Sequence, residues 1–145
     1  MRAWACDDVN LPGQAHAVMV RSPHAHARIG RIDAAEAIAL PGVLAVLTGA
    51  DFAKDGLKSI PHRPFSVSPH DVRLQNRDGS EIFIAPHWPL PADKARFVGE
   101  AVTMVVAETV RLARDAAELV RVDYEPLASV TRAADASRVT EASGS

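Results

Sequence analysis

The sequence has a single cysteine, Cys6, and no apolar run long enough to cross a membrane. One cysteine cannot form an internal disulfide, and it cannot supply the roughly four ligands of a structural zinc or iron–sulfur site. The longest mainly apolar stretch, Ala101–Ala107 (AVTMVVA), has the length of a strand and falls far short of the ~20 residues that a membrane-spanning helix needs. Any redox centre linked to this protein is therefore expected outside the chain.

The sequence also lacks a strong excess of positive or negative charge, and it contains few aromatic residues. Sixteen Lys and Arg stand against 18 Asp and Glu, a formal net charge of −2, which argues against a general nucleic-acid binder because such proteins need a strong positive field. Aromatics make up 5% of the sequence, so a core built from Ala, Val, Leu and Ile is expected. The 145 residues, 48% of them hydrophobic, predict one soluble domain.

Targeting signals are not evident at the N-terminus. The first residues, MRAWACDDVNLPG, contain one Arg followed by two acids and no apolar block, unlike a secretory signal. Together with the unpaired cysteine, this pattern favours a cytoplasmic location and gives no indication of a membrane partner.

The motifs of nucleotide-binding and nucleophilic enzymes are missing. The sequence contains no G-x-G-x-x-G, no G-x-x-x-x-G-K-[ST] and no G-x-S-x-G. Cys6 is a poor nucleophile candidate because the adjacent Asp7 and Asp8 disfavour its thiolate. Gly99, at the start of a predicted strand, could allow a ligand to approach the backbone, although tight packing within the protein is the favoured interpretation.

The histidines and carboxylates do not form a recognisable site. His24 and His26 could point the same way from an extended segment, but a catalytic zinc needs a third protein ligand and no other histidine has a suitable spacing. Local hydrogen bonding in a turn is the favoured interpretation. A catalytic acid–base pair needs an apolar pocket that shifts the pKa values of two carboxyl groups apart, and the sequence indicates no such pocket. The acidic residues lie instead at turns or on a solvent-facing strand: Asp7, Asp8, Asp51, Asp55, Asp123 and Glu125. The sequence therefore nominates no catalytic, cofactor-binding or metal-binding residue.

Residues 16–48 predict one strand–helix–strand unit. Strands over 16–22 and 27–32 flank a turn at Pro23 and could form a hairpin. Asp33 and Glu36 have the spacing of a capping box for a helix that ends before Pro41-Gly42. The apolar run 43–48 predicts a strand that is buried on both faces.

Residues 101–125 predict a second unit. The strand 101–107 is followed by an amphipathic helix over 110–119, with Thr109 as its N-cap. The next strand alternates, with Val122 and Tyr124 on one face and charged residues on the other. We therefore predict an α+β fold in which the two units share a mixed sheet with helices packed on it.

The middle of the chain has a different composition. Six of the ten prolines lie between positions 61 and 91, and only 81–84 looks like a strand. We interpret 57–93 as a proline-rich excursion within a domain spanning 1–136, followed by a flexible tail at 137–145. The apolar side chains of 57–93 could face a partner or wrap their own domain, and the sequence favours neither alternative.

Two long stretches resemble a known family. The runs 7–51 and 95–130 are similar to the a/b hammerhead domain of molybdenum hydroxylase large subunits, the family of xanthine dehydrogenase, aldehyde oxidase and carbon monoxide dehydrogenase. The resemblance rests on five pieces in the same order: LPG at 11–13, RSPHAH at 21–26, LPGV at 40–43, FVGE at 97–100 and VDYEP at 122–126.

The resemblance implies a role within a larger enzyme. Members of the family hydroxylate carbon centres or oxidise carbon monoxide at a molybdopterin cofactor, with iron–sulfur clusters and FAD carrying the electrons. The family's catalytic and cofactor-binding residues have no counterpart in this chain, so none is assigned: catalytic, cofactor and metal residues are all expected elsewhere in the assembly. Implied partners are the molybdopterin-binding domain or subunit, with iron–sulfur and flavin subunits beyond it.

Two functional hypotheses follow. The first is an N-terminal structural or docking domain, or small subunit, of such an oxidoreductase, inactive alone, in which Phe65, Phe83 or Trp88 lies near a substrate entrance or an inter-domain contact. The alternative is a free-standing ligand-binding or regulatory α+β module, which would be stabilised by its ligand. A small hydrolase ranks last because no nucleophile is evident.

Overall fold

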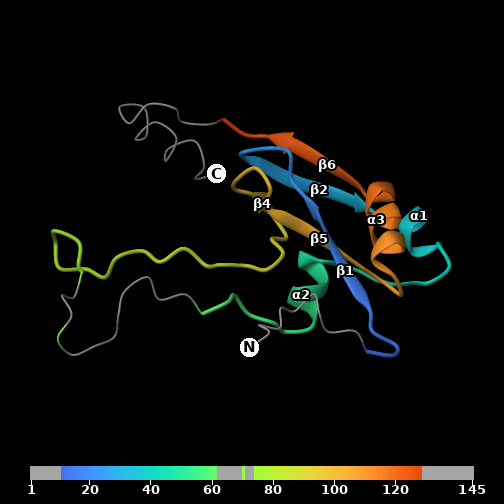
Figure 1. Cartoon of the computed structure of the whole chain (residues 1–145). Coiled ribbons are helices and arrows are strands. Elements are labelled where there is room, and N and C mark those ends of the chain that lie inside the picture. The colour runs from blue at the N-terminus through green and yellow to red at the C-terminus, as the bar shows by residue number, and fades with distance from the viewer. Residues whose placement is uncertain (1–10, 62–69, 71–73, 129–145) are drawn as a thin grey trace, which may run out of the picture.

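The computed structural model describes residues 11–61, 70 and 74–128. Their elements, labelled in Figure 1, are β1 (His16–Arg21), β2 (Ala27–Asp33), α1 (Ala35–Ile38), β3 (Val43–Thr48), α2 (Gly49–Lys54), β4 (Lys94–Ala95), β5 (Ala101–Ala107), α3 (Val110–Leu119) and β6 (Arg121–Pro126). In this part of the chain no helix is long and apolar enough to span a membrane.

The strands form two separate three-stranded sheets, ordered β1-β5-β3 and β4-β2-β6. Every pairing within them is antiparallel. The α+β class is confirmed, whereas the shared mixed sheet is not. The expected hairpin of 16–22 with 27–32 is also wrong, because β1 pairs with β5 and the chain then crosses to the other sheet. The crossing is held by Ser22, whose N–H donates to Glu100 O at 2.9 Å.

The core lies between α3 and one face of the β1-β5-β3 sheet. Val105 at the centre of β5 is fully buried and clusters with Ala37, Ala116 and Val120. Small side chains on the inner side of α3 let the helix approach the sheet closely. The strand 43–48 is confirmed as β3, but it is not buried on both faces: it is an edge strand, and Leu44 is 56% exposed.

Of the two helix N-terminal caps that the sequence predicts, one forms and the other does not. Thr109 caps α3 as predicted, its hydroxyl accepting a hydrogen bond from Leu112 N at 3.1 Å. The capping box at Asp33 and Glu36 does not form, because α1 begins one residue later and Glu36 pairs instead with Arg121 at 3.3 Å.

A capping box does occur before α2, a helix that the sequence pattern did not reveal. Both the backbone N–H and the hydroxyl of Thr48 donate to one Asp51 carboxylate oxygen, each at 2.8 Å. The side-chain hydrogen bond from Thr48 is the main reason why the pKa of Asp51 is lowered. Asp51 thereby fixes the end of β3 to the start of the helix.

Residues 57–89 leave the body and return to it as an arm, described at 57–61, 70 and 74–89 (Figure 1). The outgoing and returning legs meet where Ile60 N donates to His87 O at 2.8 Å. The tip is a turn in which Gly79 N donates to Asn76 O at 2.9 Å and Asp78 accepts from Ser80. The arm rejoins the body beside α2, where the backbone of residues 91 and 92 lies against Gly49.

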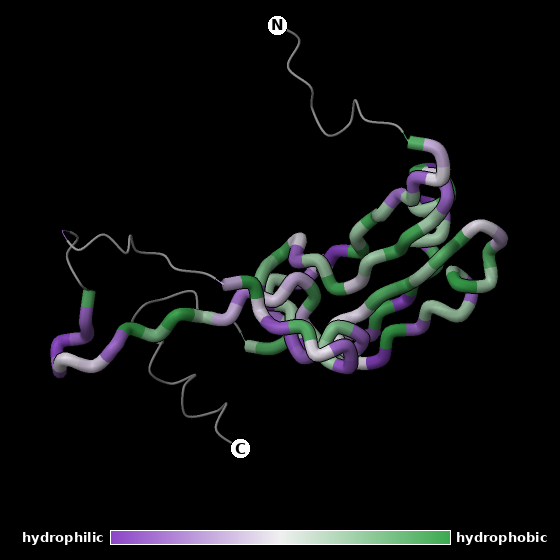
Figure 2. The backbone as a smooth tube through the Cα atoms, turned by 90° about the horizontal axis from the view of Figure 1, so that it is seen from below, coloured by the Kyte–Doolittle hydropathy of each residue, from purple (hydrophilic) through white to green (hydrophobic). Residues whose placement is uncertain are grey.

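The strand expected at 81–84 is absent from the arm. Of residues 81–84, only Glu81 pairs, as an isolated bridge to Gln75. Figure 2 shows apolar residues along the returning leg and polar ones at the tip. Phe83 is 85% exposed, so this leg does not wrap its own domain.

Candidate functional site

A groove of about 440 Å³ lies between the returning leg of the arm and the loop that leads into β5. Its walls come from three separate segments of the chain: Arg21 at the end of β1, residues 85–89 of the arm, and residues 96, 97 and 99–101. Sequence reasoning missed this groove because no single segment carries its pattern.

The wall formed by FVGE, at 97–100, is a tight turn. Glu100 N donates to Phe97 O at 3.2 Å, and Gly99 has a φ of +88°, which favours glycine. A Cβ at Gly99 would meet nothing within 4 Å, so the turn conformation rather than close packing requires this glycine. The buried carboxylate of Glu100 accepts a hydrogen bond from Arg96 N and closes the turn.

The turn is fastened to the start of the crossing between the sheets. Gly99 N donates to Ser22 O at 2.8 Å, and Arg21 Nη1 donates to Gly99 O at 2.7 Å. Two of the five family-like pieces, RSPHAH and FVGE, therefore act as one structural unit. Their contact fixes the position of this wall of the groove.

The chemistry of the groove is aromatic and cationic. Trp88 is 38% exposed and Phe97 is 58% exposed. Arg96 pairs with Asp93 at 3.2 Å, whereas Arg21 forms no ion pair with any residue that the structure describes. Such a surface suits an apolar segment that carries a carboxylate.

The histidine pair of the RSPHAH piece contacts two different partners. The ring of His24 packs on Tyr124 with centroids 5.0 Å apart, and His26 Nδ1 lies 3.0 Å from Ala128 O. The Tyr124 side chain is half-buried, and this burial raises the pKa of the phenol. These contacts join the crossing between the sheets to β6.

The acidic residues singled out in the sequence do not converge. Asp51 belongs to the α2 cap, and Asp55 is the C-cap residue of the same helix. Asp123 and Glu125 are exposed on β6, as its alternation predicts. Cys6, Asp7, Asp8 and Phe65 lie outside the described residues.

No group of three or more His, Cys, Asp or Glu side chains that could hold an ion is found within residues 11–61, 70 and 74–128.

The comparisons with known proteins identify the family. Residues 2–69 and 65–128 match the family described as "Aldehyde oxidase and xanthine dehydrogenase, a/b hammerhead domain". The chain belongs to this family.

The relatives are large subunits of oxidoreductases. The chain is 43% identical over 121 residues to the carbon monoxide dehydrogenase large chain of Afipia carboxidovorans, covering 83% of this chain and 13% of the relative. It is 34% identical over 132 residues to a xanthine dehydrogenase molybdenum-binding subunit of Escherichia coli, covering 90% and 16%. A solved Cu,Mo carbon monoxide dehydrogenase superimposes with a TM-score of 0.68 at 39% identity, covering 90% of this chain and 14% of that one.

The chain matches only a small part of each relative. This chain spans about one seventh of the length of the large subunits it matches. The match is that of one domain within a molybdenum-containing hydroxylase, as the resemblance of the five sequence pieces predicts.

Proposed function

We propose that this chain serves as a structural and docking domain of a molybdenum-dependent hydroxylase or dehydrogenase and is inactive on its own. The observation that supports this proposal is the exposure of aromatic side chains in the groove and the arm. They are exposed in a domain that spans 13% of the carbon monoxide dehydrogenase large chain. Large exposed apolar surfaces in a soluble domain mark contacts with another protein surface. Molybdopterin, iron–sulfur clusters and FAD would be held by other parts of the assembly.

The arm and the groove are the proposed contact surface. Phe83 and Trp88, at 85% and 38% exposure, would pack against the molybdopterin-binding domain or subunit of the same enzyme. The Arg21 guanidinium would pair with a carboxylate of that partner. The two aromatic residues would then lie at an inter-domain contact; Phe65 lies outside the described residues. Iron–sulfur and flavin subunits are partners of the assembly, and we propose a cytoplasmic location.

A chimera tests this function. The matched segment of the Afipia carboxidovorans large chain is replaced by residues 1–136 of this chain, our proposed domain, and assembly and carbon monoxide oxidation are measured. We expect the chimera to assemble and a large chain lacking the segment to fail. The isolated 145-residue chain should oxidise neither carbon monoxide nor xanthine. A chimera that folds but does not assemble would contradict the proposal.

The regulatory alternative gains one specific observation, the groove itself. Its aromatic walls and Arg21 could hold a planar anion instead of a protein segment. A thermal-shift screen of the isolated chain against aromatic carboxylates separates the two functions. A docking domain shows no saturable shift, whereas a regulatory module is stabilised by RT ln(1 + [L]/Kd).

A further inference from the structure

The β1-β5-β3 sheet has a second apolar face, opposite α3. Val20, Val46 and Val105 pack into the core on the helix side. Since side chains alternate along a strand, the neighbouring residues point to the other side. The strand register aligns these neighbours in two rows across the three strands: Met19, Met104 and Leu47 in one, and Ala17, Val106 and Ala45 in the other.

None of these six side chains carries a charge or a hydrogen-bonding group stronger than a thioether. Met19 is 39% exposed, Ala17 is exposed, and the other four are half-buried. Antiparallel sheets that are wetted on one face place polar residues on that face, whereas sheets covered on both sides are apolar on both. The second face of this sheet therefore has the composition of a covered surface.

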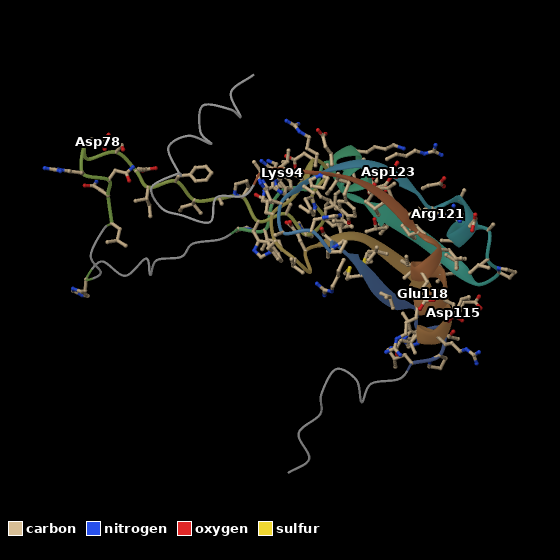
Figure 3. The ribbon with its side chains drawn as sticks, turned by 90° about the horizontal axis from the view of Figure 1, so that it is seen from above. Asp78, Lys94, Asp115, Glu118, Arg121 and Asp123 are labelled. Atoms are coloured by element: carbon tan, nitrogen blue, oxygen red, sulfur yellow. The ribbon has the colours of Figure 1, made fainter. Side chains whose placement is uncertain are left out.

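The other sheet of the same molecule provides the internal comparison. The face of β4-β2-β6 that points to solvent carries Arg28, Asp123 and Glu125, all exposed. Figure 3 shows Lys94, Arg121 and Asp123 along these strands. One chain thus contains a sheet with a solvent-facing polar side and a sheet with no polar side. The difference is specific to β1-β5-β3 and does not reflect the overall composition.

Charge marks one edge of this apolar face. Arg21 follows Ala17 and Met19 on the exposed side of β1, just beyond a shift in the strand register between Val20 and Arg21. Arg21 has no carboxylate partner among the described residues, so its covering surface should offer an acidic group there. Arg21 also lines the groove, which makes the sheet face and the groove continuous.

We propose that this sheet face is a second docking surface. Its occupant is a flat apolar surface, with an acidic residue at its edge, in the part of the large-subunit polypeptide outside this chain. That remainder is most of the subunit, because the chain spans only 13% of its relative. The proposal rests on the proposed function and extends it from the arm to the body of the domain.

The Afipia chimera tests this surface with three single substitutions. Met19→Glu puts a charge on the face, and Ala17→Arg puts a long side chain there. Ile38→Glu is the matched control, because Ile38 is 57% exposed on α1, a helix whose Ala37 packs into the core on the α3 side of the sheet. We expect Met19→Glu and Ala17→Arg to lower the yield of assembled enzyme in size-exclusion chromatography by at least about tenfold, since an unpaired charge would be buried. Ile38→Glu should change it less than about twofold.

The outcomes separate the two proposals. Failure of the unsubstituted chimera to assemble overturns the proposed function and this inference with it. Assembly of all three variants at the control level overturns the sheet face alone. Circular dichroism of each isolated variant establishes folding, and if Met19→Glu does not fold, Ala17→Arg decides. A 145-residue chain that dimerises through Met19 would assign the face to a second copy and overturn the inference.

Discussion

The body and the arm of this domain use apolar residues in opposite ways. In the body, Val105 and Ala116 have no exposed surface and pack between α3 and the sheet. In the arm, Phe83 is 85% exposed and Ile84 is 42% exposed. The body is stabilised by burial, whereas the described legs of the arm are held by an isolated bridge and a tip turn.

This difference shows that apolar content alone does not predict a core. A core forms where strands and helices can place apolar side chains against each other at regular spacing. Prolines at positions 86 and 89 remove ladder hydrogen bonds from the returning leg, so its apolar residues have no sheet to join. They remain at the surface, where another protein surface can cover them.

The largest expected effect concerns the core of the body. Val105→Asp would bury an unpaired carboxylate at the centre of β5 and should cost more than about 4 kcal/mol, enough to prevent folding. Far-ultraviolet circular dichroism and urea unfolding measure this loss. A cooperative transition at the wild-type midpoint would show that the cluster around Val105 is not the core.

The next effect lies where the arm rejoins the body. A Cβ on Gly49 would come within 2.6 Å of the backbone of residues 91 and 92. Gly49→Ala should therefore destabilise the domain by about 1–3 kcal/mol, because backbone atoms cannot move aside as a side chain can. Urea midpoints of the unsubstituted chain and of Gly49→Ala measure this cost. Equal midpoints would mean that the arm root is not tightly packed.

A stabilising change is expected within the sheet. The hydroxyl of Thr103 is buried without a hydrogen-bond partner among the described residues. Thr103→Val keeps the shape and removes the unpaired group, so the free energy of unfolding should rise by about 1–2 kcal/mol. The neighbour across the sheet, Thr48, is the control, since its hydroxyl donates to Asp51 and Thr48→Val should destabilise. Destabilisation by both would contradict the assignment.

A pH effect is expected at the α2 cap. The pKa of Asp51 is lowered in the folded state, so its stabilising contribution is complete above the ordinary value of 3.8 and is lost as the pH falls through the lower folded value. Asp51→Asn should cost about 0.5–1 kcal/mol at pH 7. Unfolding curves from pH 6 to pH 2 should show this difference shrinking toward acid. A difference that does not depend on pH would exclude the ionised cap.

The smallest effect is expected in the arm. Phe83→Ser removes a side chain that is 85% exposed, so the stability of the isolated chain should change by less than about 0.5 kcal/mol. The same substitution in the Afipia chimera should reduce assembly. A large loss of stability in the isolated chain would show that the arm folds back onto the body in solution.

The sequence predicted local elements better than their pairing. The strand 101–107, the helix 110–119 and the Thr109 cap follow from periodicity and capping chemistry within a few residues. The partner of β1 could not be predicted this way, because β5 begins about 80 residues later and local pattern does not encode distant pairing. The α2 helix was missed because its six residues make fewer than two helical turns, too few for the helical period to repeat.

Less of the candidate site than of the secondary structure could be predicted from the sequence. The exposed Trp88 and Phe83 were anticipated as partner-facing, but the groove depends on Arg21, Trp88 and Phe97 meeting from three segments. Gly99 shows the same limit: its identity indicates a special backbone position, and only the φ of +88° and the open space around it distinguish a turn from close packing.

The tip of the arm has a consequence for how the domain tolerates changes in length. The bridge between Ile60 and His87 already joins the two legs of the arm, and doubling the length of a loop adds only about 0.6 kcal/mol of closure entropy. Insertions or deletions beyond this joint leave the sheet register and the FVGE wall of the groove unchanged. The turn at Asn76–Gly79 is thus a position for a reporter or an epitope, where the domain can be followed within an assembled enzyme without altering its fold.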